Sequence, residues 1–219
     1  MITFLIATRN AHKVQEIGQI LGDDVRCLTL NDFPGAPAAI EDAETFAGNA
    51  AKKVLSLAEW LARNPDAAAK LISLEDTFYI LADDSGLEVD ALDGAPGVHS
   101  ARFAASDATT SGYTPDAGNN AKLIRLLAGR PATERGARFR CVLAVLRMNY
   151  LPEPIVYFDG ACEGRIMETA AGQGGFGYDP LFVPDGYAQS FAELGGDVKN
   201  KLSHRGRALA KLRQFIDSR

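Results

Sequence analysis

The stretch LADDSGLEVDALDGAPGVHSARFA, residues 81–104, decides how this chain is organised, because it sets two adjacent carboxylates at the end of an apolar run. The run begins in TFYILAD, residues 77–83, which has the pattern of a buried strand. LEVDAL, residues 87–92, alternates as a half-buried strand does. We therefore expect two strands joined at the acidic pair, followed by a loop whose glycines and proline set its backbone shape.

Asp83 and Asp84 would point to opposite faces of a straight strand. Ser85 and Gly86 permit a turn, which we expect to end the first strand and to let Asp84 face a ligand. Two carboxylates beside phosphates repel a substrate unless a divalent cation intervenes, and Mg²⁺ prefers such oxygen ligands. One carboxylate can also deprotonate a water. The alternative is an ordinary polar turn without chemistry.

Strands and helices alternate outward from this stretch, which indicates an α/β class with a mixed sheet. No low-complexity linker divides residues 1–219, so a single domain is predicted. The other expected strands cover residues 2–8, 25–30, 137–148 and 154–167. The expected helices cover residues 10–23, the stretch from Phe46 to the RNP at 63–65, the stretch from Pro115 through 119–130, and residues 203–217.

Composition narrows the function classes. With 219 residues, 47% of them hydrophobic, the chain is long enough to bury a sizeable core. A formal charge of −5 argues against binding to nucleic acid. Three widely spaced cysteines build neither a disulfide framework nor a zinc site, so a reducing cytoplasm is the expected location. The start lacks the basic segment of a signal peptide, and no apolar run is long enough to span a membrane.

TRNAHK, residues 8–13, lies where a strand passes into a helix. The free N–H groups and dipole of a helix N-terminus favour an anion, and Lys13 adds a full positive charge, so a phosphate site is one interpretation. The other is that Thr8 or Asn10 caps the helix while Lys13 is solvated.

GQGGFGYDPLFVP, residues 172–184, contains a Gly-x-Gly-x-x-Gly match, but a dinucleotide fingerprint needs a helix directly after its glycines. The two prolines of this motif forbid that helix. What remains is a flexible loop in which Phe176 and Tyr178 offer an aromatic surface for a base and Asp179 offers a carboxylate. The alternative is a glycine-rich turn with packed aromatic rings.

KNKLSHRGRALAKLR, residues 199–213, concentrates positive charge in an otherwise acidic chain. Such a run is usually a solvated helix face. However, Ser203, His204 and Arg205 stand at the expected N-terminus of the helix, where donors converge on anions. Arginine grips phosphate through paired hydrogen bonds, and lysine adds a point charge. His204 has no ligand-spaced histidine partner, so we do not expect it to bind a metal.

Together these pieces resemble the noncanonical purine nucleoside triphosphate pyrophosphatases, also called the inosine triphosphatase or Ham1-like family. The resemblance runs nearly from end to end, and its motifs follow in the order ATRNAHKVQEI, ETFAGNAAKK, LADDSGLEVDALDGAPGVHSARFA, ARFRCVLAV, GQGGFGYDPLFVP and KNKLSHRGRALAKL. It implies an elongated mixed sheet with flanking helices, forming two lobes around a central cleft, and commonly a homodimer. It also implies Mg²⁺-dependent hydrolysis of ITP, dITP and XTP to the monophosphate and pyrophosphate.

By position, the resemblance makes Asp84 the catalytic base and a metal ligand, with Asp83 and Glu41 as further metal ligands. The substrate-binding residues that it implies are Thr8, Arg9, Asn10, Lys13, Lys53, Ser85, Phe176, Gly177, Tyr178, Asp179, Lys199, His204 and Arg205. His99 and Arg102 receive no role from it, and we expect Ser100 and Arg102 to have a structural role, in support of either the loop or the contact between the lobes.

The chain also departs from the family pattern. Gly48 stands where an acidic residue is usual, Ala43 stands where glycine is common, and residues 62–78 are longer than the usual link. Two alternatives stay open, and Gly48 motivates the second of them. One is a pyrophosphatase for another modified or pyrimidine triphosphate, and the other is a nucleotide-binding protein with weak turnover.

Overall fold

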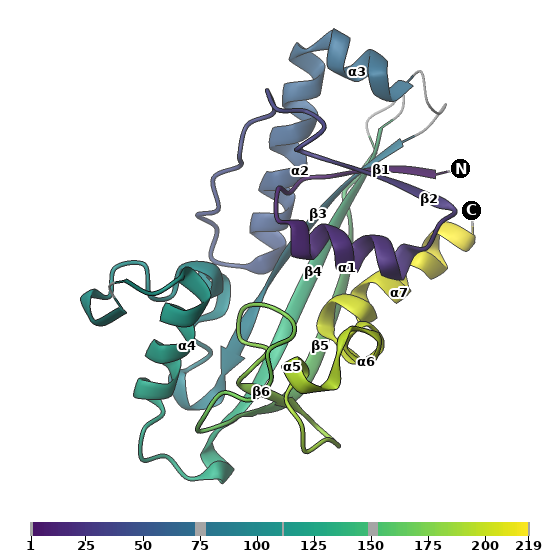
Figure 1. The fold of residues 1–219 in the computed structure, drawn as a ribbon. Coiled ribbons are helices and arrows are strands. Elements are labelled where there is room, and N and C mark those ends of the chain that lie inside the picture. Colours follow the sequence, from purple (N-terminus) through teal and green to yellow (C-terminus); the bar gives the residue numbers. More distant parts are fainter. Residues whose placement is uncertain (1, 73–77, 111, 149–152, 219) are drawn as a thin grey trace. The chain divides into compact units, whose positions relative to one another are not determined.

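A computed structural model describes residues 2–72, 78–110, 112–148 and 153–218. Six strands form one sheet in the order β2-β1-β3-β4-β5-β6 (Figure 1). The sheet is mixed, because β1 runs parallel to both β2 and β3 whereas β6 is antiparallel to β5. The predicted α/β class is therefore confirmed. The strands are β1 Ile2–Ile6, β2 Val25–Thr29, β3 Phe78–Val89, β4 Gly136–Met148, β5 Val156–Ile166 and β6 Phe182–Pro184.

The four expected helices are present. Asn10 caps α1 by accepting the main-chain N–H groups of His12 and Lys13, and Thr45 caps α2 by accepting that of Gly48. None of the described helices is long and apolar enough to cross a membrane. The helices are α1 Ala11–Leu21, α2 Phe46–Arg63, α3 Pro65–Ile72, α4 Pro115–Leu126, α5 Phe191–Leu194, α6 Gly196–Leu202 and α7 His204–Asp217. Short 3-10 turns are η1 Asp90–Leu92, η2 Gly97–Arg102, η3 Ala108–Thr110 and η4 Ala132–Glu134.

Helices α3, α5 and α6 and strand β6 were not expected from the sequence. Helix α3 begins at Pro65, where a proline suits the first helical position, and it forms part of the longer link at residues 62–78. Residues 73–77 of that link lie outside the described residues, as does Thr77 at the start of the expected strand. Because α5 and β6 are short, neither has a periodic sequence pattern from which it could be predicted.

The chain divides into two compact units. Unit 1 comprises residues 1–84, 142–159 and 208–219, and unit 2 comprises residues 85–141 and 160–207. Strand β3 passes from unit 1 to unit 2 between Asp84 and Ser85. The boundary therefore falls directly after the acidic pair.

The core of unit 1 lies between its parallel strands and α2. The apolar stripe of α2, including Ala50, Val54 and Leu57, packs against Leu5 of β1 and Ile80 of β3 in one buried cluster. Successive strand residues face opposite sides, so the neighbours of these strand residues face away from α2. This packing holds the N-terminal half of α2 beside the end of β3 in unit 1.

The core of unit 2 is rich in aromatic rings. Phe139 of β4 lies edge-on to Phe182 at 4.7 Å between ring centroids, and it stacks on His204 at 4.8 Å and 11°. Leu123 of α4 and Tyr178 of the glycine-rich loop belong to the same buried cluster. The loop is thus attached to a rigid core on one side.

The predicted turn at Ser85 and Gly86 is wrong, because β3 continues through both residues to Val89. The strand is buried along nearly all of its length, and a turn there would leave main-chain polar groups without partners. Ser100 instead accepts a hydrogen bond from the main-chain N–H of Leu87 at 2.9 Å and donates to the carbonyl of Gly97 at 2.6 Å. Ser100 therefore supports the following loop, as expected.

Candidate active site

The turn after β1 is built by its own polar side chains. Asn10 accepts hydrogen bonds from the main-chain N–H groups of His12 and Lys13 at 3.0 and 3.2 Å, and Thr8 accepts one from the N–H of Asn10 at 3.1 Å. The capping interpretation is thus confirmed for Asn10. Arg9 donates to the carbonyl of Ala36 at 2.6 Å. Lys13 is left as the side chain that carries charge from this turn to the acidic pair.

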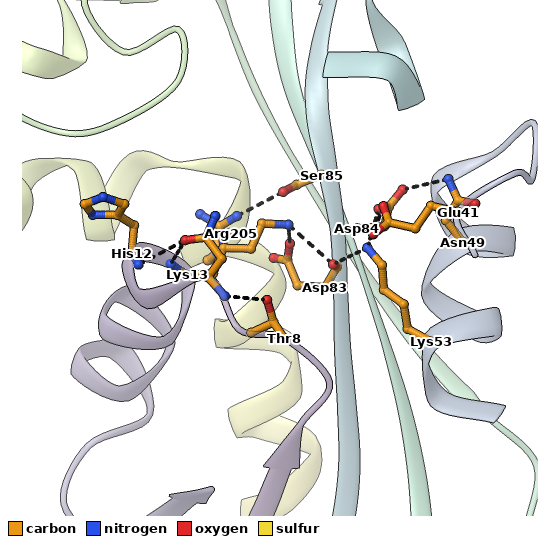
Figure 2. A network of polar contacts seen from close by, with 11 residues as sticks. Thr8, His12, Lys13, Glu41, Asn49, Lys53, Asp83, Asp84, Ser85 and Arg205 are labelled. Atoms are coloured by element: carbon orange, nitrogen blue, oxygen red, sulfur yellow. Dashed lines mark hydrogen bonds and ion pairs between the residues drawn. The ribbon is translucent and has the colours of Figure 1, made fainter. Parts of the chain in front are cut away.

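Lys13 lies against Asp83 in unit 1 (Figure 2). Its ammonium is 2.5 Å from Asp83 Oδ1 and 3.4 Å from the Asp83 main-chain oxygen. The Asp83 side chain is fully buried, whereas that of Lys13 keeps 16% of its surface exposed. A buried carboxylate requires such a partner, because an unpaired charge away from water is costly.

Lys53 of α2 serves Asp84 in the corresponding way. Its ammonium is 2.7 Å from Asp84 Oδ1, 3.1 Å from Glu41 Oε2 and 3.2 Å from the Asp83 main-chain oxygen. Asp84 and Glu41 therefore share one lysine, while Asp83 has another (Figure 2). Because β3 is continuous, Asp83 and Asp84 project to opposite faces of the strand.

Asn49 completes the surroundings of Asp84, and the sequence did not single it out. Its side chain is fully buried. The amide donates to Asp84 Oδ2 at 3.3 Å, and its oxygen accepts from the main-chain N–H of Ala43 at 2.9 Å. Asn49 and Lys53 lie four residues apart on one face of α2, so one helix holds both oxygens of Asp84. A polar i, i+4 pair inside an apolar stripe was the available signal.

The pKa values of Asp84 and Lys53 are both shifted from their ordinary values. Burial raises the pKa of Asp84 above its ordinary value, although the nearby Lys53 ammonium opposes that shift. Burial acts to lower the pKa of Lys53, but the Asp84 carboxylate, with Glu41 and Asp83, outweighs it and the pKa is raised. At neutral pH the geometry is that of a buried carboxylate–ammonium pair.

The two departures at the start of α2 are in contact with each other. A Cβ atom added to Gly48 would lie 2.8 Å from the Cβ of Ala43 and 3.1 Å from Thr45 Oγ1. The methyl group of Ala43 thus occupies the space that any side chain at position 48 would need. Glycine at 48 is the residue that this packing accepts.

The glycine-rich loop of unit 2 is held by Asp179. Asp179 Oδ2 accepts hydrogen bonds from the Lys199 ammonium at 2.6 Å and from the Phe176 main-chain N–H at 2.8 Å. The Lys199 ammonium lies 4.4 Å from the centroid of the Phe176 ring. A Cβ at Gly175 would be 2.1 Å from Asp179 Oδ2, so only glycine allows this carboxylate to fold over the turn.

Tyr178 points into the core of unit 2. It is 4% exposed, and its hydroxyl donates to the carbonyl of Ser100 at 2.9 Å. Burial raises its pKa, and the nearby Asp116 carboxylate adds to the shift. For Tyr178 the packed-aromatic alternative is therefore correct. Phe176 is only partly buried and remains the aromatic ring of this loop that is available to a ligand.

The basic segment separates into two kinds of residue. Lys199, His204 and Arg205 are buried, whereas Lys201 and Arg207 are exposed. The solvated-face interpretation is therefore wrong for the three residues expected to bind substrate. Within unit 2, Arg205 donates to Ser85 Oγ at 2.9 Å (Figure 2). Its guanidinium carbon lies 5.8 Å from the centroid of the Phe176 ring.

Most predicted site residues thus fall into two groups. Unit 1 gathers Lys13, Lys53, Asp83, Asp84 and Glu41, and unit 2 gathers Ser85, Phe176, Asp179, Lys199 and Arg205. Thr8, Asn10 and Tyr178 shape the main chain rather than the charge of these groups. Among the described residues, no group of three or more His, Cys, Asp or Glu side chains is placed to hold a metal ion.

Known proteins give an independent comparison. The model of the Ham1 family matches residues 4–215. A dITP/XTP pyrophosphatase of Desulforamulus reducens is 44% identical over 97% of this chain and 94% of its own length. Another, from Opitutus terrae, is 41% identical over 96% of each chain.

Solved structures agree with the sequence comparison. A HAM1 protein from Coxiella burnetii superposes with a TM-score of 0.80 at 31% identity, covering all of both chains. The Ham1 protein of Staphylococcus aureus gives a TM-score of 0.74 at 30% identity, covering 99% of this chain and 98% of that one. The resemblance predicted from the sequence motifs is confirmed, and the chain belongs to the Ham1 family.

Proposed function

We propose that the chain hydrolyses noncanonical purine nucleoside triphosphates (dITP, ITP and XTP) to the monophosphate and pyrophosphate. The observation that carries the proposal is the pairing of Lys13 with Asp83 and of Lys53 with Asp84 on β3. The lysines provide positive charge for a polyphosphate, and the carboxylates can bind a metal ion or accept a proton from water. The names of the similar pyrophosphatases agree with it.

The donor set of unit 1 fits Mg²⁺. Asp84 and Glu41 offer carboxylate oxygens close to one ammonium, and Mg²⁺ is usually bound by one or two carboxylates together with substrate phosphates. Bound Mg²⁺ would neutralise phosphate charge and polarise the phosphoryl group. Asp83 faces the other side of β3, so we propose that it orients Lys13, in place of the metal-binding role that the sequence suggested.

We assign to Asp84 the role of general base for the attacking water. Its carboxylate accepts a proton from the attacking water, whose oxygen bonds to the α-phosphorus while the bond to the pyrophosphate oxygen breaks. Lys53 and Asn49 each hold one Asp84 oxygen, so the carboxylate is oriented before substrate arrives. Lys13 and Lys53 supply positive charge to the phosphates while they remain paired with Asp83 and Asp84.

Base selection is assigned to unit 2. Phe176 offers a ring for stacking, and Lys199, Arg205 and His204 are donors suited to a 6-oxo acceptor. Adenine carries a 6-amino donor at that edge, which would face these donors instead of accepting from them, and a site of this kind rejects strongly. Guanine shares the 6-oxo group and must be refused at its 2-amino group.

A substrate panel tests the proposal. ITP, XTP, dUTP, GTP and ATP are offered with Mg²⁺, and pyrophosphate and orthophosphate are measured separately. We expect ITP and XTP to be preferred and pyrophosphate to be released. Preference for dUTP would favour the pyrimidine alternative, ITP binding without turnover would favour the weakly catalytic one, and stoichiometric orthophosphate would refute attack at the α-phosphorus. The homodimer, the cytoplasmic location, the cleft and the single catalytic domain formed by both units stay predictions.

A further inference from the structure

The main chain of Gly177 is held from both sides by helix α4, within unit 2. Its N–H donates to Asp116 Oδ2 at 2.8 Å, and its carbonyl accepts from Asn120 Nδ2 at 2.9 Å. Asp116 and Asn120 lie four residues apart, so they share one face of α4 and reach the same residue. We call these two hydrogen bonds the Gly177 clamp.

The clamp acts where the loop is least constrained by its own sequence. Gly177 has a φ of 63°, which favours glycine, and glycine loses more conformational freedom on ordering than any other residue. The bond from its N–H to a carboxylate is charge-assisted and therefore stronger than one to a neutral acceptor. The following residue, Tyr178, is anchored in the core by its hydroxyl, whereas the main chain of Gly177 is held by the two side chains of α4.

The orientation of Asn120 is determined by the clamp. Rotating its amide by half a turn would put Oδ1 against the Gly177 carbonyl, two acceptors facing each other. In the observed orientation Oδ1 is buried and has no hydrogen-bond partner within the described part of the chain.

Phe176 directly precedes Gly177, so the clamp acts on the main chain next to this ring. Its N–H is held by Asp179, and its ring contacts the Lys199 ammonium. With Asp179 on one side and the clamp on the other, the main chain around Phe176 is fixed at both ends. The ring can then be presented in one position instead of several.

We propose that Asp116 and Asn120 are positioning residues for base selection, which act through Gly177 to set the place of the Phe176 ring. The inference rests on the proposed function, because it assumes that Phe176 receives the purine base. In this proposal α4 contributes to specificity through the loop, and neither Asp116 nor Asn120 touches the substrate.

Four substitutions in the full-length chain test the clamp. Asn120→Asp is isosteric and sets an acceptor against the Gly177 carbonyl, while Asn120→Ala removes the donor. Asp116→Ala removes the acceptor, whereas Asp116→Asn retains a neutral one and should restore part of the lost function. The matched controls are Asn64→Asp, whose amide donates to the Trp60 carbonyl in unit 1, and Asp107→Asn, whose carboxylate pairs with Arg125 of α4.

The first readout is kcat and KM for ITP and for ATP, which differ in the base and share the triphosphate. We expect Asn120→Asp and Asp116→Ala to raise KM for ITP and to lower the ITP-over-ATP ratio of kcat/KM by about tenfold, with kcat for ITP changed by less than about threefold. Asp116→Asn should lose less than Asp116→Ala, and both controls should keep the ratio. If the two residues had a purely structural role, the substitutions would lower kcat/KM for ITP and for ATP by the same factor. That result would overturn the proposal.

The second readout needs no turnover. Hydrogen exchange of the Gly177 amide should accelerate about tenfold or more in Asp116→Ala and remain unchanged in both controls. If the parent chain hydrolyses no triphosphate, the proposed function fails, and the clamp is then judged by this exchange and by the ratio of equilibrium affinities for ITP and ATP. Unchanged exchange, or an affinity ratio that the substitutions leave unmoved, contradicts the clamp.

Discussion

Lys13 and Lys53 donate to the same acceptor, the main-chain oxygen of Asp83, at 3.4 and 3.2 Å. Each lysine also holds one carboxylate, Lys13 that of Asp83 and Lys53 that of Asp84. Since these carboxylates project to opposite faces of β3, the two ammonium groups approach the strand from its two sides. A single extended strand thus collects two cations in unit 1, where a turn would have presented both acids together.

Substituting Asp84 by Asn tests the assigned base. The variant keeps the shape of the side chain but loses the proton acceptor, so we expect kcat for ITP to fall by about 10²–10⁴-fold while affinity is largely kept. Steady-state kinetics and calorimetric ITP binding measure the two effects. Asp42→Asn is the matched control, because Asp42 is exposed and pairs with Lys52 instead. Retention of more than about a tenth of the parent kcat would remove Asp84 from this role.

The raised pKa of Asp84 predicts a pH dependence of stability in metal-free protein, which the same variant tests. Burial raises the folded-state pKa of Asp84 above 3.8, so the native state holds this proton more tightly than the unfolded state does. Its contribution to the free energy of unfolding is full below pH 3.8 and is lost as pH rises through the raised pKa. Asp84→Asn lacks that loss, so its stability relative to the parent should increase across this window. Urea unfolding at a series of pH values measures the difference, and a constant difference would contradict the raised pKa.

Asn49 should affect the rate of hydrolysis, because it orients Asp84 without itself being assigned to bind substrate. Asn49→Ala leaves the Ala43 N–H and Asp84 Oδ2 without this partner and should cost about 1–3 kcal/mol of stability. Asn49→Asp still accepts from Ala43 but sets a carboxylate against Asp84, so kcat should fall further than in Asn49→Ala. Denaturant unfolding and ITP kinetics separate the two effects, with the exposed Asn31→Asp as control. Equal kcat in both variants would show that the amide does not orient Asp84.

The contact between Gly48 and Ala43 predicts a compensating pair. Gly48→Glu should destabilise the protein by about 1–3 kcal/mol, because its Cβ would overlap the Ala43 methyl group. Ala43→Gly removes that methyl group, so the double variant should recover most of the loss. A double-mutant cycle by thermal or chemical unfolding measures the coupling. Additive effects would mean that the two positions adjust independently.

Cys162 should be inert in the folded protein. Burial raises the pKa of its thiol to about 11, so at pH 8 only about one Cys162 thiol in a thousand is ionised. Burial also raises the pKa of Cys27. Iodoacetamide labelling followed by mass spectrometry should therefore be slow at pH 8 and accelerate for Cys162 as pH approaches 11. Rapid labelling of native Cys162 at pH 8, at the rate found in urea, would contradict this protection.

Predictions from the sequence succeeded where a local pattern carries the information. The apolar spacing in α2 and the cap at Asn10 depend on residues within one or two turns, and both helices appear where expected. The turn at Ser85 and Gly86 failed, since burial of the whole strand outweighed the local preference of these residues. Asn49 was missed because its partner Asp84 lies 35 positions away.

By itself, the sequence determined the α/β class, the family, and the chemical types gathered for a triphosphate: lysines, adjacent carboxylates and an aromatic glycine-rich loop. Each of these is encoded in short stretches of chain. Only the tertiary structure decided which charges meet, joining Lys13 to Asp83 across 70 positions and Gly177 to Asp116 across 61. Those pairings depend on how strands and helices pack, and packing is a property of the folded chain that no local pattern contains.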